Sequence, residues 1–260
     1  MNNVDNQTDS VGFLRDQYLT LLESCLTGMI YEDKPIQRFG WRKFTPSQRE
    51  HGTDWPSMAH TMIGTKRLHL LRNLVEDVIN KNVSGDIVET GVWRGGACIL
   101  VRGILKAYGV TDKSVWLADS FEGLPKPNVK DYPSDKGEKF HKYNELAISL
   151  DEVKNNFTKY DLLDDQVKFL KGWFKDTLPT APIDKIAVLR LDGDLYESTI
   201  QALDALYMKV PLGGYIIIDD YHAVDACKKA VHDYLDKHNL TPTIEEIDGV
   251  GVYWQKTEKC

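Results

Sequence analysis

Four aspartates in two short motifs have the residue type and spacing that suit metal or acid-base chemistry. Asp192 and Asp194 follow one apolar run, and Asp219 and Asp220 come at the end of the next. If both runs are parallel strands, both pairs lie at the carboxyl-end rim where open α/β sheets bind ligands. An all-oxygen ligand set suits Mg²⁺ or Ca²⁺, and a cation would relieve the repulsion among the carboxylates. The alternative is that these acids only cap the helices that follow.

A glycine-rich turn follows an earlier apolar run, in the sequence Ile87-Val88-Glu89-Thr90-Gly91-Val92-Trp93-Arg94-Gly95-Gly96. Glycines let a ligand approach the backbone, and the helix that begins here offers free amides and the positive end of its dipole. Asp119 ends the next apolar run, where a carboxylate can bind ribose hydroxyls. Together they predict an adenosine cofactor. The spacing is not G-x-G-x-x-G, which favours S-adenosylmethionine over a dinucleotide, although such a turn also serves plain strand-helix packing.

Alternation of short apolar runs with helical periodicity predicts the elements that position these residues. Strands are expected at 86–90, 115–119, 167–170, 186–191 and 215–219, and helices at 58–80, 97–108, 150–159, 199–210 and 224–237. The last segment differs, because 243–247 and 250–255 flank Asp248-Gly249, a strong hairpin signal. The predicted fold is α/β, a doubly wound Rossmann-like sheet with a C-terminal antiparallel hairpin, as in class I methyltransferases.

Residues 1–56 differ in pattern from 57–260, which we expect to form the methyltransferase domain. An amphipathic helix is expected at 11–29. Its packing stripe is expected to contain Leu14, Tyr18, Leu21, Leu22 and Cys25. Residues 31–56 lack periodicity and mix charges with aromatics, which predicts a lid or binding segment. The aromatic side chains of that segment include Phe39, Trp41, Phe44 and Trp55.

Composition and charge disfavour some classes of partner and location for this protein. The chain has 260 residues and a net charge of −7 without a basic cluster, which disfavours a nucleic acid or an anionic membrane as partner. The N-terminus is polar, and no run approaches the 18 or so apolar residues of a membrane span. The four cysteines have no ligand-like spacing. These features predict a cytoplasmic protein with reduced thiols.

Several motifs together resemble the macrocin O-methyltransferase (TylF-type) family. They are 88–96, Ala118-Asp119-Ser120-Phe121, Gly172-Trp173-Phe174-Lys175-Asp176-Thr177-Leu178-Pro179, Leu191-Asp192-Gly193-Asp194, Ile218-Asp219-Asp220-Tyr221 and His60-Thr61-Met62-Ile63-Gly64. The resemblance covers about residues 54–254. It implies methyl transfer from S-adenosylmethionine to a sugar hydroxyl of a natural product, such as a macrolide or aminocoumarin, with Mg²⁺. It also implies a homo-oligomer, a dimer or larger.

The resemblance assigns roles by matching position. Asp192, Asp219 and Asp220 correspond to the metal ligands, and Asp194 to the general base. The residues implied to line or close over the methyl donor are Thr61, Met62, Glu89, Thr90, Gly91, Trp93, Gly95, Asp119, Ser120, Gly172 and Trp173. Trp55 is assigned to the acceptor pocket. Residues 126–144, rich in charges, are expected to be mobile and to order over the acceptor.

Alternatives remain open from the residues. His141 or His222 can replace Asp194 as the base. Asp192-Gly193-Asp194 is also a D-x-D motif, which would suit a metal-dependent glycosyltransferase; binding of nucleotide sugar against S-adenosylmethionine distinguishes the two. A non-catalytic subunit that binds an adenosine ligand is the third possibility, and it would show no metal site. The acceptor sugar, its aglycone and the methylated hydroxyl are not readable from this sequence.

Overall fold

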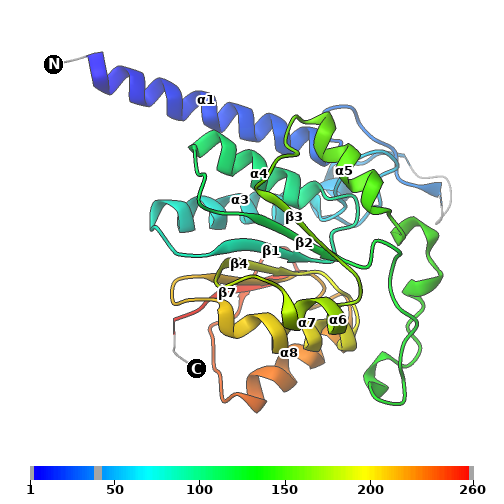
Figure 1. Ribbon diagram of the computed structural model, residues 1–260. Helices are drawn as coiled ribbons and strands as arrows, with labels where there is room; N and C mark the ends of the chain where they lie inside the picture. The colour runs from blue at the N-terminus through cyan, green and yellow to red at the C-terminus, as the bar shows by residue number, and fades with distance from the viewer. Residues whose placement is uncertain (1–2, 38–42, 258–260) are drawn as a thin grey trace.

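The computed structural model describes residues 3–37 and 43–257 (Figure 1). The helices are α1 (Asn3–Leu26), α2 (Pro46–Glu50), α3 (Gly64–Asn80), α4 (Gly96–Tyr108), α5 (Leu150–Lys159), α6 (Phe174–Thr177), α7 (Tyr196–Leu206) and α8 (Asp225–Lys237). The strands are β1 (Asp86–Thr90), β2 (Val115–Asp119), β3 (Val167–Lys171), β4 (Ile186–Leu191), β5 (Tyr215–Ile218), β6 (Glu245–Glu246) and β7 (Val252–Gln255). Phe39 and Trp41 of the expected lid lie outside the described residues.

The strands form one seven-stranded sheet in the order β3-β2-β1-β4-β5-β7-β6. The first five strands in this order are parallel, and β7 runs antiparallel to both β5 and β6. The first strand, β1, lies in the middle of the sheet. The chain adds β2 and β3 on one side of β1, and then crosses back to add β4 and β5 on the other side. The predicted doubly wound sheet with a C-terminal hairpin is therefore confirmed, as is the Rossmann-like fold class.

Two hydrophobic cores lie on opposite faces of this sheet. Helices α1, α3, α4 and α5 cover one face, and α6, α7 and α8 cover the other (Figure 1). Side chains alternate along each strand, so that Ile87 and Ile217 join the first core while Val88 and Ile216 join the second. With both faces covered, the central strands β4 and β5 are mostly apolar, which is why short apolar runs predicted them well.

Helix α1 packs differently from the expected stripe. Leu19, Leu22 and Leu26 are buried against α3 and α4, and they belong to the first core. The prediction for Leu14, Tyr18 and Leu21 was wrong, because these side chains are exposed. Apolar residues occur on more than one side of this helix, and contact with α3 and α4 decides which side is buried. The first half of α1 extends past the rest of that layer (Figure 1).

A buried arginine organises the segment before α3. Arg49 is fully buried; its Nη2 donates to Asp54 Oδ2 at 2.7 Å and its Nη1 to the Thr27 carbonyl at 2.6 Å. Asp33 Oδ2 accepts the amides of Met58 and Ala59, each at 2.7 Å. These bonds keep the stretch irregular, so the helix expected from 58 begins only at 64. Among the described residues, no helix has the length and hydropathy to cross a bilayer.

Candidate active site

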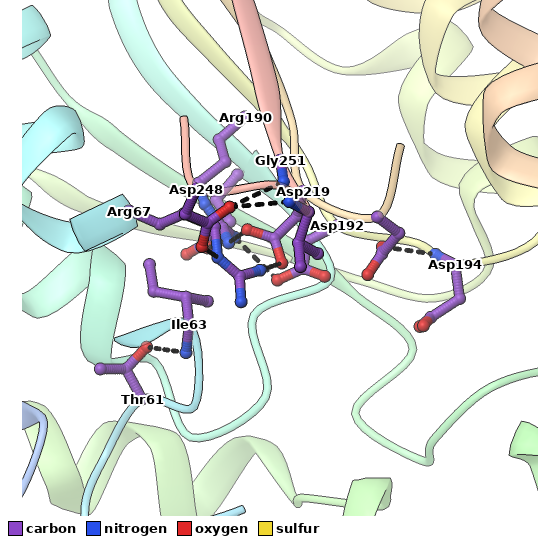
Figure 2. Close-up of polar contacts among 12 residues, drawn as sticks. Thr61, Ile63, Arg67, Arg190, Asp192, Asp194, Asp219, Asp248 and Gly251 are labelled. Atoms are coloured by element: carbon purple, nitrogen blue, oxygen red, sulfur yellow. Dashed lines mark hydrogen bonds and ion pairs between the residues drawn. The ribbon is translucent and has the colours of Figure 1, made fainter. Parts of the chain in front are cut away.

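The carboxyl ends of β4 and β5 bring three of the four predicted acids together (Figure 2). Asp192, Asp219 and Asp220 each place a carboxylate oxygen within 4.8 Å of those of the other two. Asp194 follows two residues after Asp192, and its amide donates to Asp220 Oδ2 at 3.1 Å. Its φ of 55° lies in the left-handed region that residues with a side chain rarely adopt. Three adjacent carboxylates suit a hard divalent cation.

Arg190, in strand β4, lies directly behind this cluster. It is only 2% exposed, and its Nη1 donates to Glu89 and, at 2.8 Å, to Asp192 Oδ2. Its Nη2 donates to Asp219 Oδ1. One guanidinium therefore holds three carboxylates from three different strand ends in fixed orientations.

Arg67 connects the same cluster to the C-terminal hairpin. This side chain reaches from α3, and its Nη1 donates to the second oxygen of Asp219. Its Nε lies 3.0 Å from Asp248 Oδ2. The other oxygen of Asp248 accepts the amides of Val250 and Gly251, both at 3.0 Å, which shapes the turn before β7 (Figure 2). The Asp248-Gly249 turn, which predicted the hairpin, is thus also connected through Arg67 to Asp219 at the end of β5.

The acids have strongly perturbed proton affinities. Burial, and then the charge of Asp219, raises the pKa of Asp192 to about 6. Burial, and then the charges of Asp192 and Asp219, raises the pKa of Asp194 to about 8. Burial and the charge of Asp194 hold the pKa of Asp220 well above its usual value. Two arginines do not offset so many carboxyl groups, so a bound cation would be favourable here.

The glycine-rich turn after β1 touches the turn after β4. Gly91 has a φ of 82°, and a Cβ added to it would lie 1.7 Å from the carbonyl oxygen of Asp192. The amide of Asp192 donates to the Thr90 carbonyl at 2.9 Å. Only glycine permits this approach, so the predicted donor turn and the predicted metal cluster are parts of one site.

Asp119 ends β2 beside that turn. Its Oδ2 accepts the amide of Val92 at 2.8 Å, and its Oδ1 accepts the amide of Phe121 at 2.7 Å. Ser120 donates its hydroxyl hydrogen to the Gly123 carbonyl at 2.6 Å. Both side chains are therefore held in fixed orientations at the edge of the cavity described next.

A cavity of about 520 Å³ extends along the rim from the glycine turn past the acids. The sequence-predicted residues that line it are Trp55, Met62, Gly91, Trp93, Asp119, Ser120, Gly172, Trp173, Asp192, Asp194, Asp219 and Asp220. Its volume is in the range of small-molecule sites. Leu124, Phe140 and Phe174 also line it. They contribute apolar surface to the cavity, and the sequence did not single them out as site residues.

Four of the predicted donor residues do not line the cavity. Glu89 is buried, paired with Arg190, and accepts the Cys98 thiol hydrogen at 2.8 Å. Thr61 and Thr90 are buried as well. Gly95 precedes α4 with a φ of 84°, and a Cβ there would lie 2.9 Å from Val153. These four residues do not line the cavity themselves; they shape the backbone of the residues that do.

The two histidines weighed as alternative bases also lie off the cavity. His222 Nε2 lies 2.7 Å from Glu246 Oε1 in the C-terminal hairpin. His141 Nδ1 is buried and has no hydrogen-bond partner among the described residues. Neither side chain lines the cavity, whereas Asp194 does.

Sequence reasoning missed the two arginines. Arg190 is a single charge inside an otherwise apolar strand, two residues before the first acidic motif, and that pattern is a usable signal for a buried counter-ion. Arg67 has no comparable local signal, because its partner Asp219 is 152 residues away and α3 carries several other charges.

The family described as macrocin-O-methyltransferase (TylF) matches the chain over residues 32–256. The chain belongs to this family. It is an O-methyltransferase, and the resemblance inferred from its motifs is confirmed. This finding favours methyl transfer over the glycosyltransferase and non-catalytic alternatives.

Named relatives agree with the family. The chain is 56% identical over 245 residues to demethyldecarbamoylnovobiocin O-methyltransferase of Streptomyces niveus, covering 92% of this chain and 93% of the relative. It is 50% identical over 245 residues to mycinamicin III 3''-O-methyltransferase of Micromonospora griseorubida, covering 92% and 96%.

Solved structures give the same fold. The O-methyltransferase NovP superposes with a TM-score of 0.90 at 53% identity, over 94% of this chain and 100% of that one. The calicheamicin methyltransferase CalS11 has a TM-score of 0.61 at 18% identity, over 74% of this chain and 79% of that one, which shows a shared fold only.

Proposed function

We propose that this O-methyltransferase transfers the methyl group of S-adenosylmethionine to a sugar hydroxyl of a glycosylated natural product or related glycoside, with Mg²⁺ at the aspartate cluster. The observation that carries the proposal is one cavity lined by the glycine turn, the aspartates and apolar side chains. The relatives named above are methyltransferases named for novobiocin-type and mycinamicin compounds, which supports a glycoside acceptor.

The donor is proposed to bind at the glycine-turn end of the cavity. Asp119 and Ser120 are oriented there for ribose hydroxyls, and Gly91 leaves the backbone open to the methionine part. Trp173 is 37% exposed and offers a ring for stacking of the adenine. Thr61, Met62, Glu89, Thr90, Trp93, Gly95 and Gly172 complete the proposed donor site, some only by fixing its backbone.

Asp192, Asp219 and Asp220 are proposed to hold the metal. Their oxygens lie close together, their donor type suits Mg²⁺, and the nearby arginines leave excess negative charge. When bound, Mg²⁺ would lower the pKa of a hydroxyl that it contacts.

Asp194 is proposed to accept the proton. The acceptor oxygen forms a bond to the methyl carbon while the carbon-sulfur bond breaks, and the hydroxyl proton passes to a carboxylate oxygen of Asp194. Asp194 lines the cavity two residues after Asp192, so its carboxylate is placed to take a proton from a hydroxyl bound beside the cluster. Because donor and acceptor share one cavity, alignment of the reacting atoms supplies part of the rate.

The acceptor is proposed to lie toward Trp55, which comes from the 1–56 region that we propose as helix and lid. Its ring packs edge-on against Tyr143 at 5.9 Å between centroids. A cytoplasmic location and a homo-oligomer of two or more copies are also part of the proposal. Exposed apolar residues on α1 support the oligomer. Cys25, Cys98 and Cys227, the cysteines within the described ranges, are free thiols, which agrees with a reducing compartment.

The test is transfer of labelled methyl from S-adenosylmethionine into a panel of deoxysugar glycosides, with and without EDTA. The panel includes demethyldecarbamoylnovobiocin and mycinamicin III. We expect label on the sugar, loss of transfer with EDTA and recovery with added Mg²⁺. Donor binding without transfer to any member would refute the acceptor class, and EDTA-resistant transfer would refute the metal role.

A further inference from the structure

The outer wall of the cavity is the segment 122–149 between β2 and α5. Leu124, Phe140 and Leu146 from this segment line the cavity. We infer that Asp135 is a positioning residue that fixes this wall to the beginning of α7, and with it the turn that carries Asp194. The inference rests on the proposed function, since that turn supplies the proposed base.

Asp135 supplies the missing cap of α7 from outside the helix. Its Oδ1 accepts the amide of Tyr196 at 2.6 Å, and its Oδ2 accepts the amide of Glu197 at 3.0 Å. These are the first amides of α7, which have no partner within the helix, and Leu195 at the N-cap provides no side-chain bond. A carboxylate at this end of a helix is also favoured by the helix dipole.

Burial marks Asp135 as different from the other charges of its segment. It is fully buried, whereas Asp131, Lys136 and Lys139 are exposed. Burial of a carboxylate is costly unless its oxygens are satisfied, and here two backbone amides satisfy them. The rings of Tyr132 and Tyr196 also pack against each other beside this contact, tilted by 41° with centroids 6.1 Å apart.

The anchored helix end continues directly from the catalytic turn. Asp194 is two residues before Tyr196, and the Leu195 amide donates to the Gly193 carbonyl at 2.5 Å. Glu197 itself lines the cavity. A shift of the first turn of α7 would therefore move both the proposed base and the acceptor-side wall.

The opposite end of the segment is tied separately to the donor turn. Trp93 Nε1 donates to the Glu145 carbonyl at 2.8 Å. The wall thus spans the cavity between two fixed points, one at the donor side and one at Asp135. Residues 126–144, which the sequence predicted as mobile, contain the short 3-10 turns Pro133–Asp135 and Phe140–Lys142.

The kinetic test is Asp135→Asn against the control Asp131→Asn. An asparagine can accept a hydrogen bond only through its one carbonyl oxygen, and its NH₂ group would face the second amide hydrogen. The contact between segment 122–149 and the beginning of α7 is therefore weakened. We expect kcat to fall and the acceptor KM to rise, so that kcat/KM drops about 10- to 100-fold, while the dissociation constant of S-adenosylhomocysteine stays within twofold. Asp131 is exposed, and its side chain bonds to Asn128 of its own segment, so Asp131→Asn should match the wild type.

An acceptor-free measurement separates this inference from the proposed function. In Asp135→Asn, deuterium exchange at the Tyr196 and Glu197 amides and tryptic cleavage at Lys136 and Lys139 should both be faster than in Asp131→Asn. If the wild type methylates no glycoside, the proposed function fails, but this exchange result still tests the anchor.

Tyr132→Ala serves if Asp135→Asn does not fold, since it weakens the same contact without altering the buried charge. The same kinetic split, smaller in size, is expected. Wild-type kinetics and exchange in both variants would overturn the inference. An equal loss of donor and acceptor affinity that tracks the melting temperature would also overturn it, because that result indicates a purely structural role.

Discussion

Asp194 occupies an unusual backbone conformation at the cavity wall, where burial and the charges of Asp192 and Asp219 raise its pKa to about 8. We predict that Asp194→Asn lowers kcat by about 10²- to 10⁴-fold, the usual contribution of a positioned acid or base. Affinities for Mg²⁺ and S-adenosylhomocysteine, measured by calorimetry, should be unchanged because the three proposed ligands remain. His222→Gln is the control and should retain activity. Equal turnover in Asp194→Asn would remove it as the base.

Arg190 is the buried cation on which three carboxylates depend. We predict that Arg190→Met lowers the free energy of unfolding by about 3–5 kcal/mol, because it leaves the buried carboxylates of Glu89 and Asp219 and the partly buried one of Asp192 without this partner. Urea denaturation followed by circular dichroism measures this loss.

The control for Arg190 is Lys229→Met, which breaks an exposed pair with Asp233. That pair has a distance of 2.6 Å, as short as a buried one, but both side chains are open to solvent. Its loss should cost less than about 1 kcal/mol. Similar losses in the two variants would show that burial of the Arg190 network contributes little to stability.

At the scale of elements, the site depends on contact between the turns after β1 and β4. We predict that Gly91→Ala weakens binding of both S-adenosylhomocysteine and Mg²⁺ at least tenfold, because the new methyl would overlap the Asp192 carbonyl and push the two turns apart. Calorimetric titration of each ligand into the variant measures this.

Gly109→Ala separates that overlap from backbone strain. Gly109 ends α4 with a φ of 67°, similar to the 82° of Gly91, but a Cβ there meets nothing within 4 Å. We expect a loss of about 1 kcal/mol of stability from the left-handed backbone and unchanged ligand binding. Normal binding in both variants would mean that the turns do not need this contact.

The sequence predicted the central elements well because their signals are local. Apolar runs bounded by turns identified β1, β4 and β5, and the strand ends placed Asp192 and Asp219 at one rim. The features that the sequence did not predict depend on contacts between segments that are distant in the chain. No local pattern shows that Asp135 caps α7, and none shows that Leu19 rather than Leu14 faces the core.

At the scale of the molecule, one side of the site is formed by the ends of buried strands and the other side by segments outside the sheet. The sheet is packed on both faces, so the strand ends that carry Asp192 and Asp219 are fixed by the most buried part of the protein. The opposite wall comes from segments outside the sheet, around Trp55 and Phe140. Differences in acceptor among such enzymes are therefore expected to arise in that wall, which lies outside the sheet.

The exposed apolar side chains of α1 are the feature that most directly concerns assembly. Phe13 and Leu14 are 63% and 64% exposed, and Leu21 is 52% exposed, on a helix whose first half extends beyond its layer. Such a surface is costly in water unless it is covered, and a second copy of the chain can cover it with the same residues.

We predict that the wild type is a dimer or larger assembly and that Leu14→Asp converts it to a monomer of 29.6 kDa, as measured by size-exclusion chromatography with light scattering. Leu212→Asp places the same charge at another exposed leucine, in the connection before β5, and should leave the assembly intact. A monomeric wild type, or an assembly that survives Leu14→Asp combined with Phe13→Asp, would show that α1 is not the contact surface.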